Sequence, residues 1–428
     1  MDKIVKSLNS VRARVTPPGD KSISHRAVLL LSLAQGVSRI ANLSLGADVL
    51  SSMQCMTQLG VCFEREGAEH VISSPGLCSF TSPSQTLDCG NSGTTMRLLA
   101  GILAGSGVDG ILSGDASLNR RPMLRVVEPL SAMGALITAA TLATPPLHIT
   151  GAKLKGISWQ PSVASAQVKS AILLAGLSAT GQTEVLERYP TRDHTERMLK
   201  ALGANIAYKP GFAAIVGQRA LQAANLSIPG DISSAAFFLV LAAMLPDSTV
   251  TVENVGLNEG RTGLLEVLEM MGAQVCAEVQ DSAWEPVGTI KVQGAKLRGF
   301  EICGALVPRL IDEIPILAVA ACVAQGRSVV HDAAELRAKE SDRISQLLSE
   351  LRKMGAKCEE HADGFTIEGG RLQGAVVNSH GDHRLAMALA IAGLVASGTT
   401  IIRDAECVDI SYPGFWTDLE SVRGERRD

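Results

Sequence analysis

The sequence predicts a two-domain α/β protein assembled from six similar repeats of about 70 residues. Three features lead to this prediction. A helix-like apolar segment occurs six times, each copy is followed by a short segment with the alternation of a β-strand, and five copies continue into a second amphipathic segment that ends in Leu-Gly or Met-Gly. The glycines that close the second segments lie 74, 69, 69 and 83 residues apart, a regularity that a single doubly wound sheet would not predict.

Each repeat begins with the apolar helix and continues into the strand. Five of the helical segments close on a small residue, one further residue and a glycine, whereas the sixth, 231–248, closes on a Pro-Asp-Ser turn. The five segments are 23–36, 94–107, 168–181, 312–326 and 384–398. The strand segments alternate in polarity and cover 37–43, 108–114, 182–188, 249–255, 327–333 and 399–405.

The second amphipathic segment is expected to be a helix that ends at its glycine, because glycine readily adopts the left-handed conformation that closes helices. These glycines are Gly60, Gly134, Gly203, Gly272 and Gly355, and the sixth repeat ends instead at 418–422. Six repeats exceed one hydrophobic core, so three per domain is the economical grouping. The second domain should begin near Ser227, and on this pattern the Val-alternating residues 1–18 fit either half.

Composition excludes several classes of protein. A hydrophobic fraction of 46% indicates a globular chain, and apolar stretches no longer than 11 residues are too short to span a bilayer. A net charge of -4 and an aromatic fraction of 3% argue against a nucleic-acid partner. The N-terminus lacks the apolar stretch of a signal peptide, and the nine cysteines are odd in number with no C-x-x-C pair. We therefore expect a cytoplasmic protein whose cysteines are buried, reduced thiols.

No cofactor or metal is expected. A P-loop and a G-x-G-x-x-G turn after a strand are both absent, as is the G-x-S-x-G signal of serine hydrolases. The nearest histidine pair, His380 and His383, lacks the spacing and partners of a zinc site.

The informative polar residues lie at the starts of the apolar helices. Helix N-termini present unpaired N–H groups and a partial positive charge, so small polar residues there, with a cation one turn further on, make a cradle for anions. Ordinary N-capping by Ser, Thr, Asp and Asn is the alternative at any single start. The coincidence of several such starts with Lys21, Arg26, Arg97 and Arg384 favours anion binding. The starts are Gly19–Arg26, Gly90–Arg97, Ser165–Lys169, Asp312–Glu313 and Gly381–Arg384.

Two further basic clusters join a strand to a helix. Residues 114–122 include Arg121, and Pro122 fits the first helical position. Residues 335–343 include Lys339 and Arg343, which are four apart and are expected to share a helix face. A solvated charged face is the usual explanation for such a run. Arg192 in the equivalent place of the third repeat weakens that explanation.

Six motifs together resemble the 5-enolpyruvylshikimate-3-phosphate synthases, the 3-phosphoshikimate 1-carboxyvinyltransferases of aromatic amino-acid biosynthesis. The motifs are GDKSISHR at 19–26, GNSGTTMR at 90–97, SAQVKSA at 165–171, TRDHTERML at 191–199, RAKESDR at 337–343 and GDHRLAM at 381–387. The resemblance implies a two-domain inside-out α/β barrel in which each domain holds three repeats of a βαβαββ unit. It also implies domains of 19–228 and of 1–18 plus 229–428, with the active site in the cleft between them.

The resemblance further implies the reaction and its residues. The enolpyruvyl group of phosphoenolpyruvate would pass to the 5-hydroxyl of shikimate 3-phosphate with release of phosphate. The residues implied for shikimate 3-phosphate are Lys21, Ser22, Arg26, Ser165, Ala166, Gln167, Arg192, Asp312 and Lys339. Those implied for phosphoenolpyruvate are Lys21, Gly93, Arg121, Gln167, Arg343 and Arg384. Asp312 would be the base for the hydroxyl and Glu340 the acid at the methylene carbon, with Lys21 bridging the reacting groups.

Some residues depart from the pattern of many relatives. Ile410 stands where many place a lysine that contacts phosphoenolpyruvate, and Leu98 stands where many have proline. These features resemble the bacterial class II subgroup, some members of which tolerate the inhibitor glyphosate. Gly93 is the unsubstituted residue of the sensitive pattern, so we expect glyphosate to bind.

Three alternatives stay open. The related enolpyruvyl transferase that acts on UDP-N-acetylglucosamine uses a cysteine in a mobile loop, and none of the nine cysteines lies in an evident loop of that kind. A cyclase of RNA 3'-phosphate ends would need a nucleotide-linked histidine and a basic surface. A non-catalytic anion-binding protein of the same fold would not need Lys21, Asp312 and Glu340 together. The expected partners are therefore the two small substrates, with no nucleic acid or membrane, and the chain is expected to be a monomer.

Overall fold

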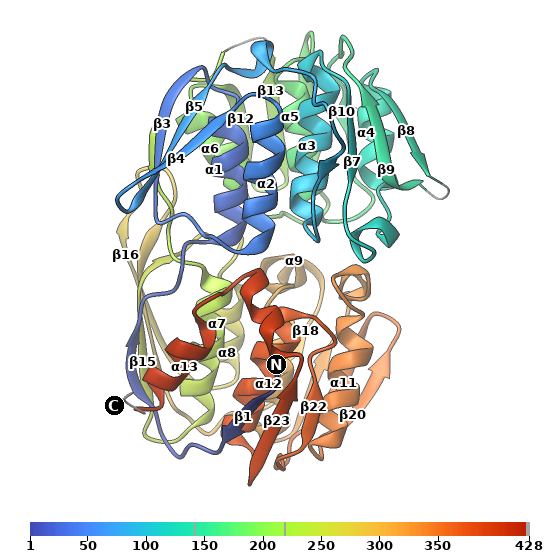
Figure 1. Ribbon diagram of the computed structural model, residues 1–428. Coiled ribbons are helices and arrows are strands. Elements are labelled where there is room, and N and C mark those ends of the chain that lie inside the picture. Colours follow the sequence, from blue (N-terminus) through green and yellow to red (C-terminus); the bar gives the residue numbers. More distant parts are fainter. Residues whose placement is uncertain (141–142, 218–219, 425–428) are drawn as a thin grey trace. The chain divides into compact units, whose positions relative to one another are not determined.

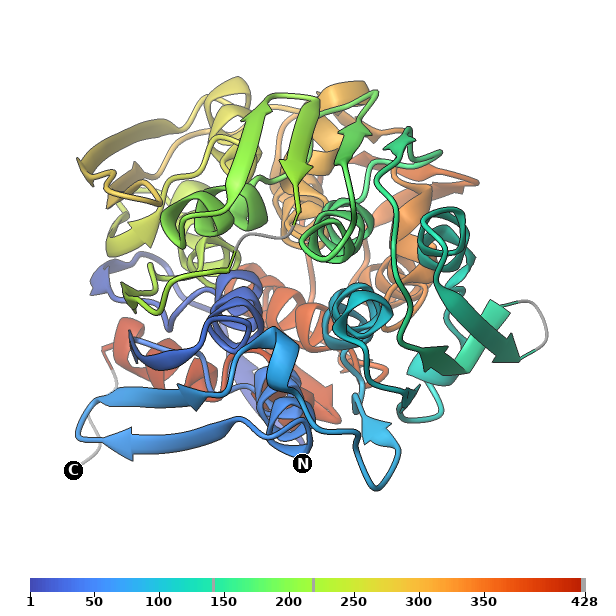
Figure 2. The same ribbon diagram turned by 90° about the horizontal axis from the view of Figure 1, so that it is seen from above.

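The computed structural model describes residues 1–140, 143–217 and 220–424. The chain divides into two compact units, a continuous unit of Gly19–Ile228 and a split unit of Met1–Pro18 with Pro229–Asp428. Figures 1 and 2 show the elements of both. Within the described ranges, every helix is too short or too polar to cross a bilayer.

The continuous unit contains three four-stranded sheets of the same design. In each, a short strand pairs in parallel with the first strand of the repeat, and that strand pairs with an antiparallel hairpin. The first sheet has the order β14 (Asn225–Ser227), β3 (Gly36–Ala41), β5 (Glu69–Ser74) and β4 (Cys62–Glu66). The second has β6 (Leu87–Asp88), β7 (Gly110–Ser113), β9 (Thr144–Thr150) and β8 (Leu136–Ala140). The third has β10 (Ser158–Trp159), β11 (Gln182–Leu186), β13 (Phe212–Val216) and β12 (Asn205–Lys209).

The apolar helices of the continuous unit are almost completely buried, and each repeat adds a second, amphipathic helix. The buried helices are α1 (Lys21–Leu31), α3 (Gly93–Ser106) and α5 (Ala166–Gly176). The second helices are α2 (Ala47–Gln58), α4 (Leu124–Ala132) and α6 (His194–Ala201), with 3₁₀ turns at η1 (Leu77–Ser79) and η2 (Leu118–Arg120). The backbones of α3 and α5 approach closely, since a Cβ at Gly101 would lie 2.2 Å from the carbonyl oxygen of Ala171. Only glycine fits there.

The split unit repeats the design and takes two strands from the N-terminal segment. One sheet has the order β16 (Gln274–Asp281), β17 (Val287–Gln293), β15 (Thr249–Gly256) and β2 (Arg12–Val15). The next has β18 (Glu301–Ile302), β19 (Arg327–Val330), β21 (Gly364–Glu368) and β20 (Lys357–His361). The last is three-stranded, with β1 (Lys3–Lys6), β23 (Thr399–Arg403) and β22 (Val376–Asn378). In that sheet β1 runs antiparallel to β23 and stands where the other repeats have a hairpin.

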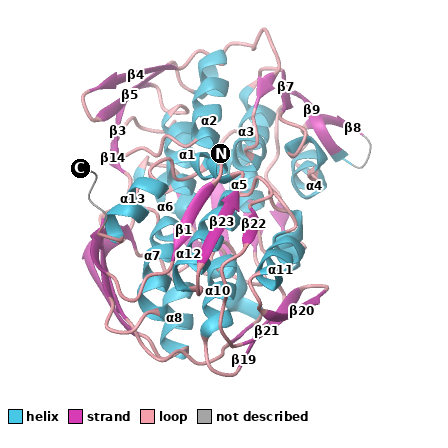
Figure 3. Ribbon diagram, turned by 60° about the horizontal axis from the view of Figure 1, so that its bottom comes forward, coloured by secondary structure: helices cyan, strands magenta, loops and turns pink. Residues whose placement is uncertain are grey.

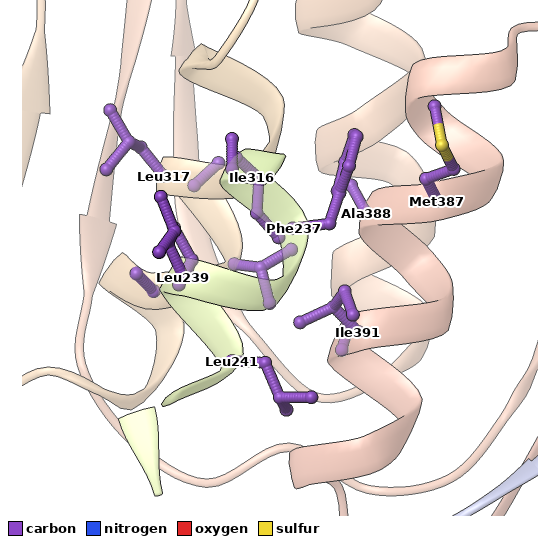
Figure 4. Packing of buried hydrophobic residues seen from close by; sticks show 14 of the residues in the cluster. Phe237, Leu239, Leu241, Ile316, Leu317, Met387, Ala388 and Ile391 are labelled. Carbon is purple, nitrogen blue, oxygen red and sulfur yellow. The ribbon is translucent and has the colours of Figure 1, made fainter. Parts of the chain in front are cut away.

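Three apolar helices form the centre of the split unit, and Figure 3 shows strands outside them. They are α7 (Ile232–Met244), α10 (Ile314–Val323) and α12 (His383–Val395). Such all-round apolar helices are buried from every side. Their side chains pack together, as Figure 4 shows for Phe237, Ile316 and Ile391. The remaining helices are α8 (Gly263–Met270), α9 (Val307–Leu310), α11 (Arg343–Lys353) and α13 (Phe415–Val422), with 3₁₀ turns at η4 (Gly304–Leu306), η5 (Ala334–Ala338) and η6 (Ala405–Ile410).

The structure confirms the α/β class and the helix ends predicted from the glycines. Each of the five Leu-Gly and Met-Gly glycines directly follows the helix C-cap residue and has a positive φ, between 84° and 102°. The expectation that all cysteines are buried is wrong. All nine are free, but four are exposed, among them Cys62 and Cys276 on the outer hairpin strands β4 and β16.

Candidate functional site

The starts of the buried helices in the continuous unit are capped by their own side chains. Asp20 accepts a hydrogen bond from the backbone N–H of Ile23 at 2.8 Å, and Ser92 accepts from Thr95 at 3.1 Å. Ser165 caps α5 in the same way. N-capping is therefore present at these starts, and the cations of the next turn stand beside the caps.

Lys21, Ser22 and Arg26 lie on the first turns of α1. The ammonium of Lys21 lies 3.0 Å from a carboxylate oxygen of Asp48, on the first turn of α2. Arg192, just before α6, donates to the hydroxyl of Ser22 at 3.1 Å. Arg26 is 2% exposed, and this burial is possible because its guanidinium group donates to two hydroxyls and a carbonyl oxygen. Its partners are Thr195 Oγ1 at 2.7 Å, Ser170 Oγ at 3.0 Å and Ser22 O at 2.9 Å.

Two arginines flank Gly93 at the start of α3. A Cβ on Gly93 would lie 2.6 Å from Nη1 of Arg97 and 3.3 Å from Nη1 of Arg121, so the missing side chain makes room for both guanidinium groups. Arg97 donates to Gln167 Oε1 at 2.6 Å, and Arg121 donates to Asn91 Oδ1 at 2.6 Å. These amide partners orient the two guanidinium groups and leave their positive charge in place.

A carboxylate forms the centre of the polar cluster in the split unit. The Oδ1 atom of Asp312 lies 3.8 Å from Nζ of Lys339, 3.7 Å from Nη1 of Arg343 and 3.8 Å from Nε of Arg384. Arg384 also donates to the backbone oxygen of Asp312 at 3.1 Å. Three cations from two segments of the chain, 339–343 and the start of α12, thus surround one acidic side chain that is 13% exposed.

Arg343 is bound by further carboxylates. Its Nη2 lies 2.6 Å from Glu340 Oε2, and its Nε lies 2.8 Å from Asp382 Oδ2. Burial is the largest influence on Asp382 and by itself would raise its pKa, but the charge and the hydrogen bonds of Arg343 act against burial, and the pKa lies below its ordinary value. The same carboxylates raise the pKa of Arg343 despite its burial. Asp382 also accepts from the N–H of Arg384 at 2.9 Å, so one carboxylate caps α12 and orients Arg343.

With this geometry in view, comparisons with known proteins assign the family. The family model for EPSP synthase (3-phosphoshikimate 1-carboxyvinyltransferase) matches residues 5–419. The chain belongs to the EPSP synthase family. It is 49% identical to the 3-phosphoshikimate 1-carboxyvinyltransferase of Desulforamulus reducens, with 99% of both chains covered. It is 48% identical to that of Thermodesulfovibrio yellowstonii, with 99% of this chain and 100% of the relative covered.

Solved structures of EPSP synthases agree with the fold. The EPSP synthase of Acinetobacter baumannii, solved at 2.37 Å, matches with a TM-score of 0.86 and 42% identity, covering 98% of this chain and 97% of that one. The two-domain inside-out α/β barrel of the EPSP synthases is therefore the fold of this chain. The buried helices lie inside each unit and the sheets lie around them.

Two local expectations about this EPSP synthase family member are wrong. Lys339 and Arg343 do not share a helix face, because Lys339 directly follows the η5 turn and Arg343 begins α11. They meet at Asp312 instead. Pro122 is not the first residue of α4, since Met123 is the N-cap residue and the helix begins at Leu124.

Sequence reasoning missed several polar neighbours of the predicted residues. Asp382 belongs to the GDHR motif and could have been included from it, because an Asp at a helix start is a strong N-cap. Asp48 contacts Lys21 only through tertiary packing, and no local pattern marks it. Thr195 lies within the TRDHTERML motif, but its contact with Arg26 also depends on tertiary packing. Ala166 begins α5 and is mostly buried, and Ile410 ends η6.

No cluster of three or more His, Cys, Asp or Glu residues able to hold a metal occurs in the described part of the chain. Of the two histidines considered as ligands, His380 lies 2.8 Å from Glu350, and His383 is buried on the first turn of α12.

Proposed function

We propose that the two polar clusters bind the same pair of substrates, shikimate 3-phosphate and phosphoenolpyruvate. Family membership gives the reaction, in which the enolpyruvyl group of phosphoenolpyruvate moves to the 5-hydroxyl of shikimate 3-phosphate and phosphate is released. Together these substrates carry two phosphoryl groups and two carboxylates, so a site for both needs many cations in one place. We propose that residues 19–228 and residues 229–428 both contribute cations to this site.

The contacts of the continuous unit support a role in holding shikimate 3-phosphate. Ser22, Arg26 and Arg192 lie within one hydrogen-bonded group, and Ser165, Ala166 and Gln167 form the start of α5. A helix start and guanidinium groups offer N–H donors to an anion. Lys339 and Asp312 of the split unit complete the proposed set.

Phosphoenolpyruvate is assigned to the arginines around Gly93 and Asp312. Arg121 lies beside Gly93, while Arg343 and Arg384 lie beside Asp312. In the transition state, negative charge builds up on the departing phosphate, and fixed guanidinium groups stabilise that charge without reorganisation. Lys21 and Gln167 would contact both substrates.

The chemistry is an addition followed by an elimination. In the addition, Asp312 accepts the proton of the 5-hydroxyl, Glu340 donates a proton to the methylene carbon, and the C–O bond to the central carbon forms. This step gives a tetrahedral ketal that still carries the phosphate. In the elimination, Glu340 takes a proton back from the methyl group, the bond to phosphate breaks and the double bond is restored. The proton on Asp312 leaves with the phosphate.

The observation that carries the mechanism is the meeting of Lys339, Arg343 and Arg384 at the carboxylate of Asp312. Asp312 and Arg384 lie far from Lys339 and Arg343 in the sequence, and a scaffold protein would have no need for a carboxylate at the centre of its cations. The test is phosphate release from phosphoenolpyruvate with shikimate 3-phosphate as acceptor, and with UDP-N-acetylglucosamine as the competing acceptor. Release only with shikimate 3-phosphate supports the proposal. Release only with the sugar nucleotide, or with neither acceptor, contradicts it.

We further propose that a single chain is sufficient and that the protein works in the cytoplasm. Every residue assigned a role belongs to one chain, and all nine cysteines are free, as expected in a reducing compartment. Sedimentation velocity with both substrates present tests the first point, since a dimer at catalytic concentrations would contradict it.

A further inference from the structure

A buried ion cluster lies next to Arg192 and has no place in the mechanism above. Lys169 of α5 places its ammonium 2.9 Å from Glu187 Oε2 and 2.8 Å from Glu196 Oε1. None of the three side chains is more than 3% exposed. Buried charges are costly unless they are paired, and removing one partner leaves an uncompensated charge. Because burying these three charges is costly, we expect the cluster to hold a specific part of the chain in place.

The cluster is attached to the backbone of the residue that precedes Arg192. Lys169 Nζ donates to the carbonyl oxygen of Thr191 at 3.3 Å. The N–H of Thr191 donates to Glu187 Oε2 at 3.3 Å, and its hydroxyl donates to Glu187 Oε1. The N–H, the carbonyl and the side chain of Thr191 are thus all bound by one ion pair.

This segment has no regular structure of its own. It connects β11, which ends at Leu186, to α6, which begins at His194. Glu187 lies at one end of the connection, and Glu196 lies on the first turn of α6. Lys169 therefore joins both ends of the connection to α5, the helix whose start carries Ser165 and Gln167. Lys169 therefore fixes the backbone from which the side chain of Arg192 extends.

The charge balance of the cluster supports a permanent ammonium at its centre. Burial opposes the charged form of Lys169, but the two carboxylates outweigh burial and raise its pKa. Burial also raises the pKa of Glu196, whose Oε2 atom has no hydrogen-bond partner. Of the two carboxylates, Glu187 binds both Lys169 and Thr191. Glu196 binds Lys169 from α6.

We propose that Lys169, acting through Glu187 and Thr191, is a positioning residue that holds Arg192 in place for shikimate 3-phosphate. The inference rests on the proposed function for the role of Arg192, and it adds the device that orients that arginine. Lys169 touches no substrate in this account. Its loss should therefore weaken binding of shikimate 3-phosphate and leave phosphoenolpyruvate almost unaffected.

The test is a double-mutant cycle between Lys169→Met and Arg192→Ala, measured in the full-length enzyme. Lys169→Met should raise KM for shikimate 3-phosphate about 10-fold and change KM for phosphoenolpyruvate and kcat less than about twofold. In the Arg192→Ala background the same substitution should have no further effect on KM, because the residue that it positions is gone. An equal effect in both backgrounds overturns the inference.

Two further variants separate positioning from stability. Glu187→Gln keeps the shape and removes the charge, so it folds more readily than Lys169→Met and should raise the same KM about threefold. Ile72→Ala makes a cavity in β5 of the same unit and should lower the thermal midpoint without moving either KM. If Lys169→Met and Glu187→Gln lower the midpoint but leave KM for shikimate 3-phosphate unchanged, Lys169 is only structural. If wild type releases no phosphate with both substrates, the proposed function itself fails.

Discussion

The two polar clusters both hold arginines in fixed positions, but the groups that bind these arginines differ. In the continuous unit, Arg121 is oriented by the amide of Asn91 and the hydroxyl of Ser117. In the split unit, Arg343 is oriented by the carboxylates of Glu340 and Asp382 and also lies beside Asp312. Neutral partners leave a guanidinium charge available for a substrate, whereas carboxylates compensate it before a substrate arrives.

This difference indicates that the two units have different roles in the reaction. Acid and base groups are needed for the proton transfers, and the split unit supplies both proposed groups, Asp312 and Glu340, already held by cations. The continuous unit supplies mainly hydrogen-bond donors, and its largely buried ion pairs include those of Lys21 with Asp48 and of Lys169 with Glu187 and Glu196. We therefore expect substitutions in the split unit to affect kcat and stability most, and substitutions in the continuous unit to affect KM most.

The largest effect is expected for Asp312→Asn. The substitution keeps the size of the side chain and removes the proposed base, so kcat should fall by about 10² to 10⁴, the usual range for loss of a general base. The dissociation constant for shikimate 3-phosphate, measured by calorimetry, should change much less. Full activity of this variant would remove Asp312 from the mechanism.

The next prediction compares how much the free energy of unfolding falls when each of two buried arginines is replaced. Arg343→Met leaves the buried carboxylate of Asp382 without its cation and should cost about 3–5 kcal/mol in free energy of unfolding. Arg26→Met removes a donor from the carbonyl oxygen of Ser22 and from two hydroxyls, and those of Ser170 and Thr195 already lie 2.6 Å apart, so its cost should be about 1–3 kcal/mol. Urea denaturation measures both, and adding Asp382→Asn to Arg343→Met should recover part of the loss. An equal cost for the two arginines would contradict the comparison.

Gly93→Ala tests the space between the two arginines of the continuous unit. The new Cβ would lie 2.6 Å from Arg97 Nη1, so the guanidinium group must move. We expect KM for phosphoenolpyruvate to rise about 10-fold, in line with the 1–3 kcal/mol cost of overpacking. Wild type should be inhibited by glyphosate below millimolar concentration, and the variant should need more inhibitor. Glyphosate inhibition of wild type only at millimolar concentration would contradict the prediction.

The smallest effect is a pH dependence that differs between the units. Burial, together with the charges of Lys21 and Arg26, holds the pKa of His25 well below 6.5. As the pH falls below 6.5, His25 therefore binds a proton in the unfolded chain but not in the folded chain. The free energy of unfolding should fall by up to about 1.4 kcal/mol per pH unit. Asp382 has a lowered pKa, so its contribution is lost only below its ordinary value of 3.8.

Urea denaturation between pH 7 and pH 5 measures the first of these contributions. His25→Asn keeps a polar atom near Ser52 and should remove the decrease in the free energy of unfolding with falling pH, which is the slope that is measured. His148→Asn, at an exposed position of β9, is the matched control and should keep the slope. Equal slopes in wild type and His25→Asn would mean that His25 takes up a proton in the folded chain.

Local patterns were enough to predict the repeats. The period of apolar segments and the Leu-Gly or Met-Gly pairs depend on residues close in sequence, and the helix ends with positive φ follow from them. The exposure of Cys62 could also have been predicted, because its strand CFERE carries charged residues on both sides of the chain. Free cysteines are often buried, but the charged neighbours of Cys62 indicate an exposed strand.

Tertiary contacts were beyond local patterns. Arg26 and Thr195 lie 169 positions apart and meet because α1 packs against α6. The meeting of Lys339 and Arg343 at Asp312 depends on a turn that separates two residues expected on one helix. The roles of the predicted site residues stay predictions until substrates are bound or residues are replaced.

The most direct test of the account is the KM for phosphoenolpyruvate in Arg121→Gln and Arg384→Gln, one variant from each unit. If both clusters bind the same substrate, each substitution should raise this KM about 10-fold or more, because each removes a charged hydrogen-bond donor. If one variant raises KM and the other leaves it at the wild-type value, the clusters do not share phosphoenolpyruvate and the account is wrong.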